Sequence, residues 1–300
     1  MISILVPVYN YDIRDLASEL NNQISVLDTK IEVIFYDDFS TKKNITETNK
    51  NTANQFGFTF YTSDLNRGIA EALNYLSTLA KYDWLIYLDA DVVPVNSNFI
   101  EIYIQLINDQ NKAFCGGLLY QEDKPKEGIL RWKYGQKYEV QTLEQANKNP
   151  YLNFKTCNFL IHKSVLGKNK FKSKNNLYGN IDTLFGLNLK QINIDVFFIE
   201  NRVYHYGLED SITFLNKTDL AIDSVISMYM NKNLKIENTR LIKFYLILKK
   251  GRITNLCKLF LENLKPMMLK NLKSNNPSVN IFQLYKLYLV LYKMSLLNKS

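Results

Sequence analysis

The sequence predicts an α/β protein with a mostly parallel central sheet flanked by helices and a helical extension at the C-terminus. Over the first 210 residues, short apolar runs rich in β-branched and aromatic residues alternate with segments whose apolar residues recur at helical spacing. Several of these runs end abruptly in acidic residues. Strands that alternate with helices form βαβ units, and right-handed crossovers bring the carboxyl ends of their strands to one edge of the sheet.

The elements follow in order along the chain. Strands are predicted over residues 2–8, 31–36, 58–61, 84–88, 113–120, 154–161, 196–199 and 203–205. Helices are predicted over residues 13–27, 69–79, 98–108 and 183–189, where apolar residues recur every three or four positions. The strand predicted over residues 113–120 contains Gly116 and Gly117. A buried glycine pair in a strand indicates the close approach of a ligand or of another backbone.

Acidic pairs follow two of the predicted strands. Asp37 and Asp38 close the second strand, and Asp89 and Asp91 follow the strand that begins at Trp84. Residues two apart in an extended segment point the same way, so Asp89 and Asp91 are expected to converge. Two close carboxylates repel each other, and a hard divalent cation that carries phosphates would relieve this repulsion. The alternative is a solvated acidic turn at the end of a strand.

Other classes of protein lack their sequence motifs here. No Gly-x-Gly-x-x-Gly follows the first strand and no Gly-Lys-Ser/Thr occurs, which argues against a dinucleotide fold and a P-loop. The cysteines Cys115, Cys157 and Cys257 are odd in number and widely spaced, so neither disulfides nor a zinc site is expected, as suits a reducing cytosol. We expect neither a secretory signal nor a membrane-spanning helix, because the chain opens on a strand and no apolar run approaches about 18 residues.

The C-terminal region is strongly basic. Residues 211–300 hold 15 Lys and Arg against 4 Asp and Glu, a net charge of +11, whereas residues 1–210 hold 22 against 25, a net charge of −3. Apolar residues recur at helical spacing over 241–264 and 281–297. Basic residues mixed with bulky apolar ones are typical of helices that lie on an anionic membrane. The alternative is a helical subdomain that packs on the body or on a second subunit in a homo-oligomer. No nucleic-acid partner is expected, because no nucleic-acid-binding motif accompanies the charge.

Six short motifs occur in one order along the first 210 residues. They are Pro7-Val8-Tyr9-Asn10, Asp37-Asp38, Asn66-Arg67-Gly68-Ile69-Ala70, Asp89-Ala90-Asp91, Tyr178-Gly179-x-x-Asp182 and Val203-Tyr204-His205. In this order the chain resembles the family 2 glycosyltransferases, which have a GT-A fold, and especially those that build bacterial surface polysaccharides. The resemblance implies a GT-A nucleotide-sugar transferase domain over residues 1–210, followed by a basic helical region over residues 211–300.

The resemblance also implies roles for individual residues. The residues implied in nucleotide and donor binding are Pro7, Val8, Tyr9, Asp37, Asp38, Asn66, Arg67, Gly68, Asp89 and Ala90. Within this set Asp38 would accept a hydrogen bond from the uracil ring. Asp91 would coordinate Mn²⁺ or Mg²⁺, with Asp89 beside it and His205 completing the metal shell. Asp182 would be the general base for the acceptor hydroxyl.

These roles together imply an inverting, metal-dependent glycosyltransferase. Its donor would be a nucleotide sugar, with UDP as the nucleotide, and its acceptor a hydroxyl group of a glycan or of a lipid-linked molecule. One base and in-line attack on the anomeric carbon give inversion. The expected location is the cytoplasm, with peripheral binding to the inner face of the plasma membrane.

The sequence departs from the family pattern at two places. Ile181 precedes Asp182 where the family usually has Glu, and Leu73 precedes Asn74 where many members have Arg. A degenerate transferase that serves as a binding or assembly partner is therefore an alternative. A sugar-1-phosphate nucleotidyltransferase is a second alternative, although no Gly-rich basic loop follows the first strand. Arg131 and Trp132 are candidates for holding the acceptor; a plain surface loop is the competing interpretation of these two residues.

Overall fold

The computed structural model of the chain describes residues 1–172, 179–230 and 239–297. The chain divides into two compact units. The first unit consists of Met1–Gln121, Glu139–Lys172 and Ile181–Gly207, and the second of Glu122–Tyr138, Ser173–Asn180 and Leu208–Ser300. The second unit thus includes Glu122–Tyr138 from the middle of the chain in addition to the C-terminal region.

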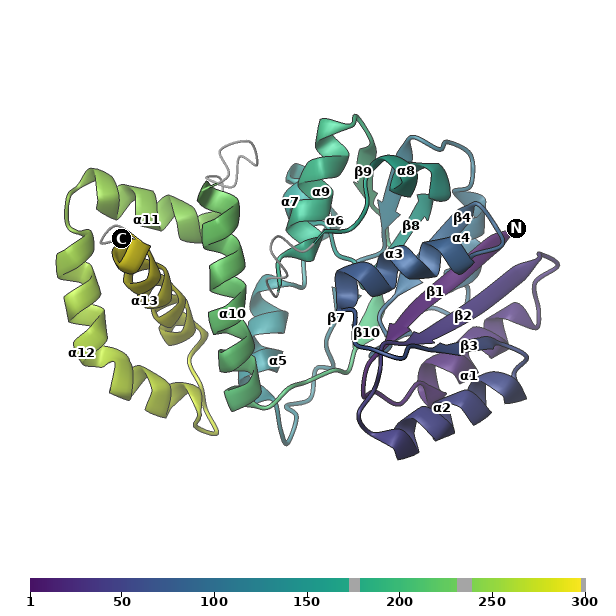
Figure 1. Cartoon of the computed structure of the whole chain (residues 1–300), viewed down its shortest axis with the longest axis horizontal. Coiled ribbons are helices and arrows are strands. Elements are labelled where there is room, and N and C mark those ends of the chain that lie inside the picture. Colours follow the sequence, from purple (N-terminus) through teal and green to yellow (C-terminus); the bar gives the residue numbers. More distant parts are fainter. Residues whose placement is uncertain (173–178, 231–238, 298–300) are drawn as a thin grey trace. The chain divides into compact units, whose positions relative to one another are not determined.

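A seven-stranded sheet forms the centre of the first unit (Figure 1), in the order β3-β2-β1-β4-β8-β6-β9. The strands are β1 (Ile2–Val8), β2 (Ile31–Asp37), β3 (Thr59–Thr62), β4 (Trp84–Leu88), β6 (Lys112–Cys115), β8 (Asn158–His162) and β9 (Asp195–Phe198). The neighbours from β3 to β4 pair in parallel, as do β6 and β9, whereas β8 runs antiparallel between β4 and β6. The predicted α/β fold with a mostly parallel sheet is confirmed.

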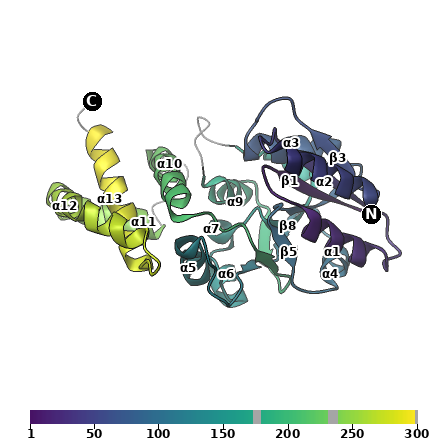
Figure 2. The same cartoon turned by 90° about the horizontal axis from the view of Figure 1, so that it is seen from below.

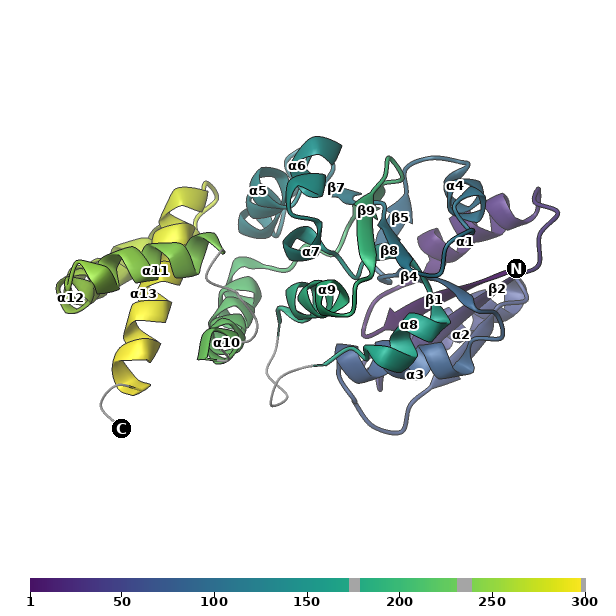
Figure 3. The same cartoon turned by 90° about the horizontal axis from the view of Figure 1, so that it is seen from above.

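Helices cover both faces of this sheet (Figures 2 and 3). The helices are α1 (Arg14–Ile24), α2 (Lys43–Gln55), α3 (Ile69–Leu79), α4 (Phe99–Gln105), α6 (Leu143–Lys148), α7 (Pro150–Asn153), α8 (Lys163–Lys168) and α9 (Ile181–Gln191). Helices α1 and α4 lie on one face, and α3 and α8 lie on the other. The core beneath α3, α8 and α9 is rich in aromatic rings, and the centroids of Phe171 and Phe185 lie 4.0 Å apart. Burial of this apolar surface is the main force that holds the unit together.

A small second sheet corrects one sequence prediction. The prediction of one continuous strand over residues 113–120 is wrong. Strand β6 ends at Cys115, before Gly116 and Gly117, and β7 (Leu118–Leu119) belongs to a different sheet. It joins β5 (Val92–Pro94) and β10 (Val203–His205) in the order β5-β10-β7. The reason for a glycine is steric, since a Cβ at Gly116 would lie 2.0 Å from the carbonyl oxygen of Asn201.

The second unit is helical, as the predicted C-terminal extension requires. Its helices are α5 (Ile129–Tyr138), α10 (Ser211–Met230), α11 (Arg240–Lys250), α12 (Thr254–Leu272) and α13 (Val279–Leu297). Helix α13 is apolar on most sides and supplies the centre of a cluster that includes Phe282, Tyr285 and Leu289. A helix that is apolar all round is a buried helix. In the described part of the chain, no helix combines the length and the apolar character needed to cross a bilayer.

Candidate active site

The loops after β1 and β2 are tied together at the carboxyl edge of the sheet. Asn10 adopts a positive φ of 54°, which asparagine tolerates better than most residues. Its side-chain oxygen accepts hydrogen bonds from the backbone N–H groups of Thr41 and Lys42, both at 2.9 Å. The end of β1, with buried Pro7 and Val8, is thereby held beside residues 38–42. Tyr9 is half exposed there.

The two acids after β2 have different surroundings. Asp37 is buried and accepts hydrogen bonds from the backbone N–H and the hydroxyl of Ser40 and, at 3.1 Å, from the hydroxyl of Thr46. It therefore closes the turn after β2 and anchors the start of α2. Its role in binding the donor stays a prediction, because its hydrogen bonds in the structure go to Ser40 and Thr46 of the same turn and helix.

Asp38 joins two of the sequence motifs. Its carboxylate oxygens accept hydrogen bonds from the backbone N–H groups of Arg67 at 2.9 Å and Gly68 at 2.8 Å. The side chain of Asn66 donates to the Asp38 carbonyl at 3.1 Å. Gly68 has a φ of 78°, in the left-handed region that favours glycine. Each Asp38 oxygen keeps a second lone pair, so the carboxylate can accept a further bond from a ligand.

Asp89 precedes a turn between β4 and β5, and Asp91 lies in it. Residues 90 and 91 form this turn, so the expected extended geometry is wrong, although the two carboxylates still lie close together. Withdrawal of the Asp89 carboxylate from water, together with the charges of Asp91 and Asp182, raises the pKa of Asp89 well above its usual value. Asp89 is therefore near enough to both Asp91 and Asp182 to feel their charges at this end of the sheet, and buried Ala90 lies between Asp89 and Asp91.

The small sheet brings His205 to Asp91. In the antiparallel pairing of β10 with β5, His205 lies opposite Val92, the residue after Asp91. The backbone N–H of Tyr206 also donates to the Asp91 carbonyl at 2.8 Å. As a result, His205 Nε2 lies 3.6 Å from Asp91 Oδ2. The other ring nitrogen, Nδ1, is buried and has no hydrogen-bond partner among the described residues.

Gly207 and Tyr11, which the sequence analysis did not single out, complete the surroundings of Asp91. A Cβ at Gly207 would lie 1.7 Å from Asp91 Oδ2, so the carboxylate occupies the space of the missing side chain. Burial, followed by the charge of Asp91, raises the pKa of Tyr11 to about 12. Both residues adjoin quoted motifs in the sequence, but only the folded chain shows that they face the same acid.

Asp182 reaches the other carboxylates from a distant segment. It lies in the first turn of α9 and accepts a hydrogen bond from the hydroxyl of Thr156 at 3.0 Å. Thr156 lies just before β8, whose antiparallel pairing with β4 brings it to the end of the strand that precedes Asp89. Ile181, in the place of the usual Glu, is buried in the main apolar cluster. Tyr178, from the same motif, lies outside the described residues.

The donor set fits a divalent cation that is shared with a ligand. Among the described residues, no group of three His, Cys, Asp or Glu side chains is arranged to hold a metal ion by itself. Asp91 and His205 provide two donors, with Asp89 nearby. Mg²⁺ is commonly held by one or two carboxylates plus substrate phosphates, and Mn²⁺ accepts carboxylate ligands as well. These residues can therefore supply part of a coordination shell that phosphate oxygens would complete.

The candidate acceptor residues belong to the second unit. Arg131 and Trp132 lie in α5, so the surface-loop interpretation is wrong. The Arg131 guanidinium lies 5.5 Å from the centroid of the Phe214 ring. In the first unit, the structure brings together Asp89, Asp91, Asp182 and His205. It also joins Asp38 to residues 66–68.

Comparisons with known proteins identify the family of the chain. The model of the family "Glycosyl transferase family 2" matches residues 3–169, more than half of the chain. An uncharacterized glycosyltransferase of Haemophilus influenzae is 34% identical over 93 residues, which cover 30% of this chain and 29% of that protein. The chain thus spans less than a third of this curated relative, and 39% of a longer chain of S. aureus TarS.

Solved structures share the fold at low sequence identity. S. aureus TarS 1–349 in complex with UDP-GlcNAc superposes with a TM-score of 0.53 at 14% identity, covering 98% of this chain and 92% of that one. Mannosyltransferase PcManGT from Pyrobaculum calidifontis, in complex with GDP-Man and Mn²⁺, gives a TM-score of 0.53 at 13% identity, covering 76% and 64%. These likenesses support the GT-A fold.

Proposed function

Because the chain belongs to glycosyl transferase family 2, we propose that it transfers a sugar from a nucleoside diphosphate donor to a hydroxyl group of an acceptor. The observation that carries the proposal is the meeting of Asp91 and His205, 3.6 Å apart, with Asp89 and Asp182 at the carboxyl edge of the sheet. A carboxylate and an imidazole at this distance can supply two ligands to a cation whose remaining ligands are pyrophosphate oxygens. Ligands of open α/β sheets bind at this edge.

Asp91 and His205 are the proposed ligands of a divalent cation, Mn²⁺ or Mg²⁺. When bound, such a cation stabilises the negative charge that the diphosphate gains as its bond to the sugar breaks. Asp89 lies beside this position and would face the ribose or the sugar. Because Gly207 has no side chain, the Asp91 carboxylate can occupy the position beside it.

Asp182 is the proposed general base. Its carboxylate would accept the proton of the acceptor hydroxyl as the hydroxyl oxygen attacks the anomeric carbon and the carbon–oxygen bond to the diphosphate breaks. Thr156 donates to one Asp182 oxygen and leaves the other for this proton. A single displacement with one base inverts the anomeric carbon.

UDP is the proposed nucleotide, and Asp38, held between the end of β2 and the loop at residues 66–68, would accept from its base. Solved relatives contain UDP-GlcNAc, or GDP-Man with Mn²⁺, which supports a nucleotide-sugar donor. The proposed acceptor is a glycan or a lipid-linked molecule, reached from the cytoplasm at the inner face of the plasma membrane.

The buried position of Ile181 bears on the degenerate-transferase alternative. Ile181 packs in the apolar cluster rather than facing the acids, so the departure at this position leaves Asp182 and Thr156 in place. This favours an active enzyme over a binding partner.

Isothermal titration calorimetry tests the proposal. UDP should bind the chain in the presence of Mn²⁺ or Mg²⁺, and GDP should bind more weakly. The Asp91→Asn variant should lose most of this binding. The Asp182→Asn variant should still bind UDP but should neither hydrolyse a UDP-sugar donor nor transfer its sugar. Absence of binding by any nucleoside diphosphate with either metal would refute the proposed function.

A further inference from the structure

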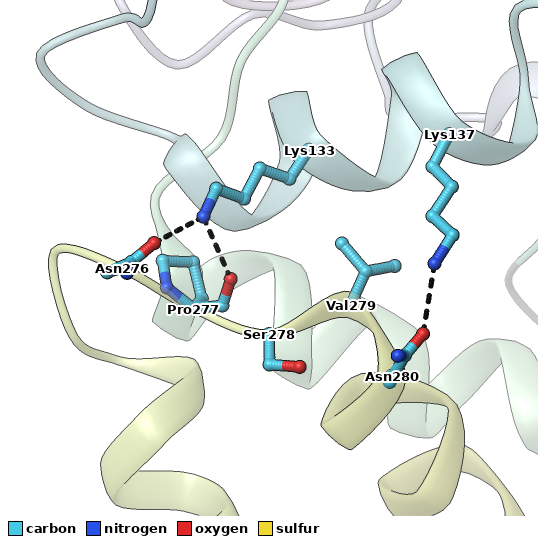
Figure 4. A pocket seen from close by; sticks show the side chains of 7 residues that line it. All are labelled: Lys133, Lys137, Asn276, Pro277, Ser278, Val279 and Asn280. Carbon is cyan, nitrogen blue, oxygen red and sulfur yellow. Dashed lines mark hydrogen bonds between the residues drawn. The ribbon is translucent and has the colours of Figure 1, made fainter.

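Among the described residues of the second unit, two groups of basic residues differ in what their side chains contact. The first group, Lys133 and Lys137 of α5, lines a cavity of about 350 Å³ together with residues 276–280 (Figure 4). The Lys133 ammonium donates to Asn276 Oδ1 at 2.5 Å and to the Pro277 carbonyl at 3.2 Å. Lys137 donates to Asn280 Oδ1 at 3.0 Å. The two lysines therefore hold the loop before α13 and the first turn of α13 against α5.

The second group lies at the surface formed by α11, α12 and the turn that joins them (Figure 1). Five apolar side chains there are each more than half exposed to solvent. They are Phe244, Ile247, Leu256, Leu259 and Phe260. Lys243 and Lys250 are exposed beside them on α11, and Arg252 is exposed in the turn. These eight residues are called the α11–α12 face.

The exposed apolar residues form stripes of their own rather than the edge of the core. On α11, Ile242 and Tyr245 are buried while Phe244 and Ile247 point outward. On α12, Leu261 and Met268 are buried. Leu256, Leu259 and Phe260 recur at helical spacing on another side of that helix, and Met267 continues the stripe. Large apolar residues exposed in stripes of this kind indicate an interaction site.

The charge of the face selects the partner. Residues 243–260 contain five Lys or Arg and no Asp or Glu. A second copy of the chain docked through the same face would bring two sets of like charges together, since an isologous interface pairs a surface with itself. Apolar side chains flanked by lysines are suited to an anionic bilayer, where the former enter the acyl boundary and the latter meet lipid phosphates.

We infer that the α11–α12 face docks the protein on an anionic lipid bilayer. This inference rests on the proposed function, because docking on a membrane would bring the active site to an acceptor that is held in the membrane. The proposed membrane contact is formed by α11 and α12 and not by the last helix, α13. Most apolar side chains of helix α13 are buried in the core of the second unit, and only Leu284, Leu296, Leu297 and Tyr292 among its described large apolar residues are exposed.

Vesicle flotation with the full chain tests the inference. The chain should bind vesicles of phosphatidylcholine with about 30% phosphatidylglycerol, and binding should weaken between 0.1 and 0.5 M NaCl because salt screens the lysines. It should not bind vesicles of phosphatidylcholine alone. Each basic residue near an anionic surface contributes about fivefold in affinity, so Lys243→Gln with Lys250→Gln should weaken binding about 25-fold. The triple change Leu256→Ser, Leu259→Ser and Phe260→Ser should abolish binding.

A matched control removes equal charge elsewhere. Lys30 and Lys50 are exposed in the first unit, and their change to Gln should leave vesicle binding unchanged. The inference is overturned if the parent chain ignores anionic vesicles, or if the variants of the face bind as well as the parent. It is also overturned if sedimentation velocity shows a dimer that the triple change converts to a monomer. Calorimetry with UDP on the same samples separates the two proposals, because the face variants should bind UDP normally.

Discussion

Gly207→Ala should abolish metal-dependent nucleotide binding while the fold stays intact. The added Cβ would lie 1.7 Å from Asp91 Oδ2 and 2.6 Å from its Cγ, whereas ordinary contacts begin at 3.4 Å. The carboxylate oxygen must therefore move by about 1.7 Å, since the Cβ is attached to rigid backbone. Metal–oxygen distances tolerate changes of only about 0.2 Å. Displacement on this scale removes Asp91 from the coordination shell.

The expected loss is at least 10- to 100-fold in affinity for UDP with Mn²⁺, the range found when a metal ligand loses its support. Asp91 is 26% exposed and can turn toward solvent, so the melting temperature should change little. Gly167→Ala is the matched control, because a Cβ there meets no atom within 4 Å. Calorimetry of both variants, with circular dichroism to confirm folding, measures the effect. Undiminished UDP binding by Gly207→Ala would refute the assigned role of Asp91.

Three further substitutions test other parts of the account. Thr156→Val should lower kcat about 10-fold with little change in UDP affinity, because Asp182 loses a hydrogen bond to a charged group, and Thr156→Ser should restore it; equal activity of the two variants would argue against a positioning role. Asp182→Asn should lower the transfer rate at least about 100-fold at unchanged donor affinity, and a rate near that of the parent would exclude Asp182 as the base. Lys293→Met should lower the free energy of unfolding of the second unit by about 1–3 kcal/mol in urea, because the Lys293 amine donates to the carboxylates of Asp219 and Asp223 at 3.0 and 2.8 Å. Changing both acids to Asn in the same variant should restore the stability. An unchanged urea midpoint in Lys293→Met would contradict this role of Lys293.

Much of the sheet was predictable because each strand is an apolar run with a clear end. The strands at Ile2, Ile31 and Trp84 pair as the βαβ pattern requires. Helix α2 could not be predicted in the same way. Its sequence over Lys43–Gln55 is almost entirely polar, and only Asn49, Thr52 and Ala53 are buried. Such a helix depends on its tertiary contacts rather than on an apolar stripe.

The candidate site was predictable residue by residue but not in its geometry. Asp89 and Asp91 were chosen on the assumption of an extended segment, yet they converge through a turn. His205 meets Asp91 because β10 pairs antiparallel with β5, a contact between segments more than 100 residues apart. Gly207 and Thr156 carry no local signal, because their importance comes from what lies opposite them in the fold.

The tail shows the limit of composition as a guide. The sequence over Val279–Leu297 is apolar on nearly every side, which is equally typical of a membrane-facing helix and of a core helix. In the structure, apolar residues of α10, α11 and α12 enclose Phe282, Tyr288 and Leu291, so this side of the helix is part of a core. The exposed apolar residues of α11 and α12 are fewer and become apparent only when the buried ones are known.

The central claim is that Asp91 and His205 together hold a cation bound to a diphosphate. Anomalous diffraction from crystals grown with UDP and Mn²⁺ tests it most directly. We expect one manganese peak roughly 2.0–2.3 Å from an Asp91 oxygen and from His205 Nε2, in contact with both phosphates of UDP. A manganese peak bound by other residues, or UDP bound away from the carboxyl ends of β1, β2 and β4, would contradict it.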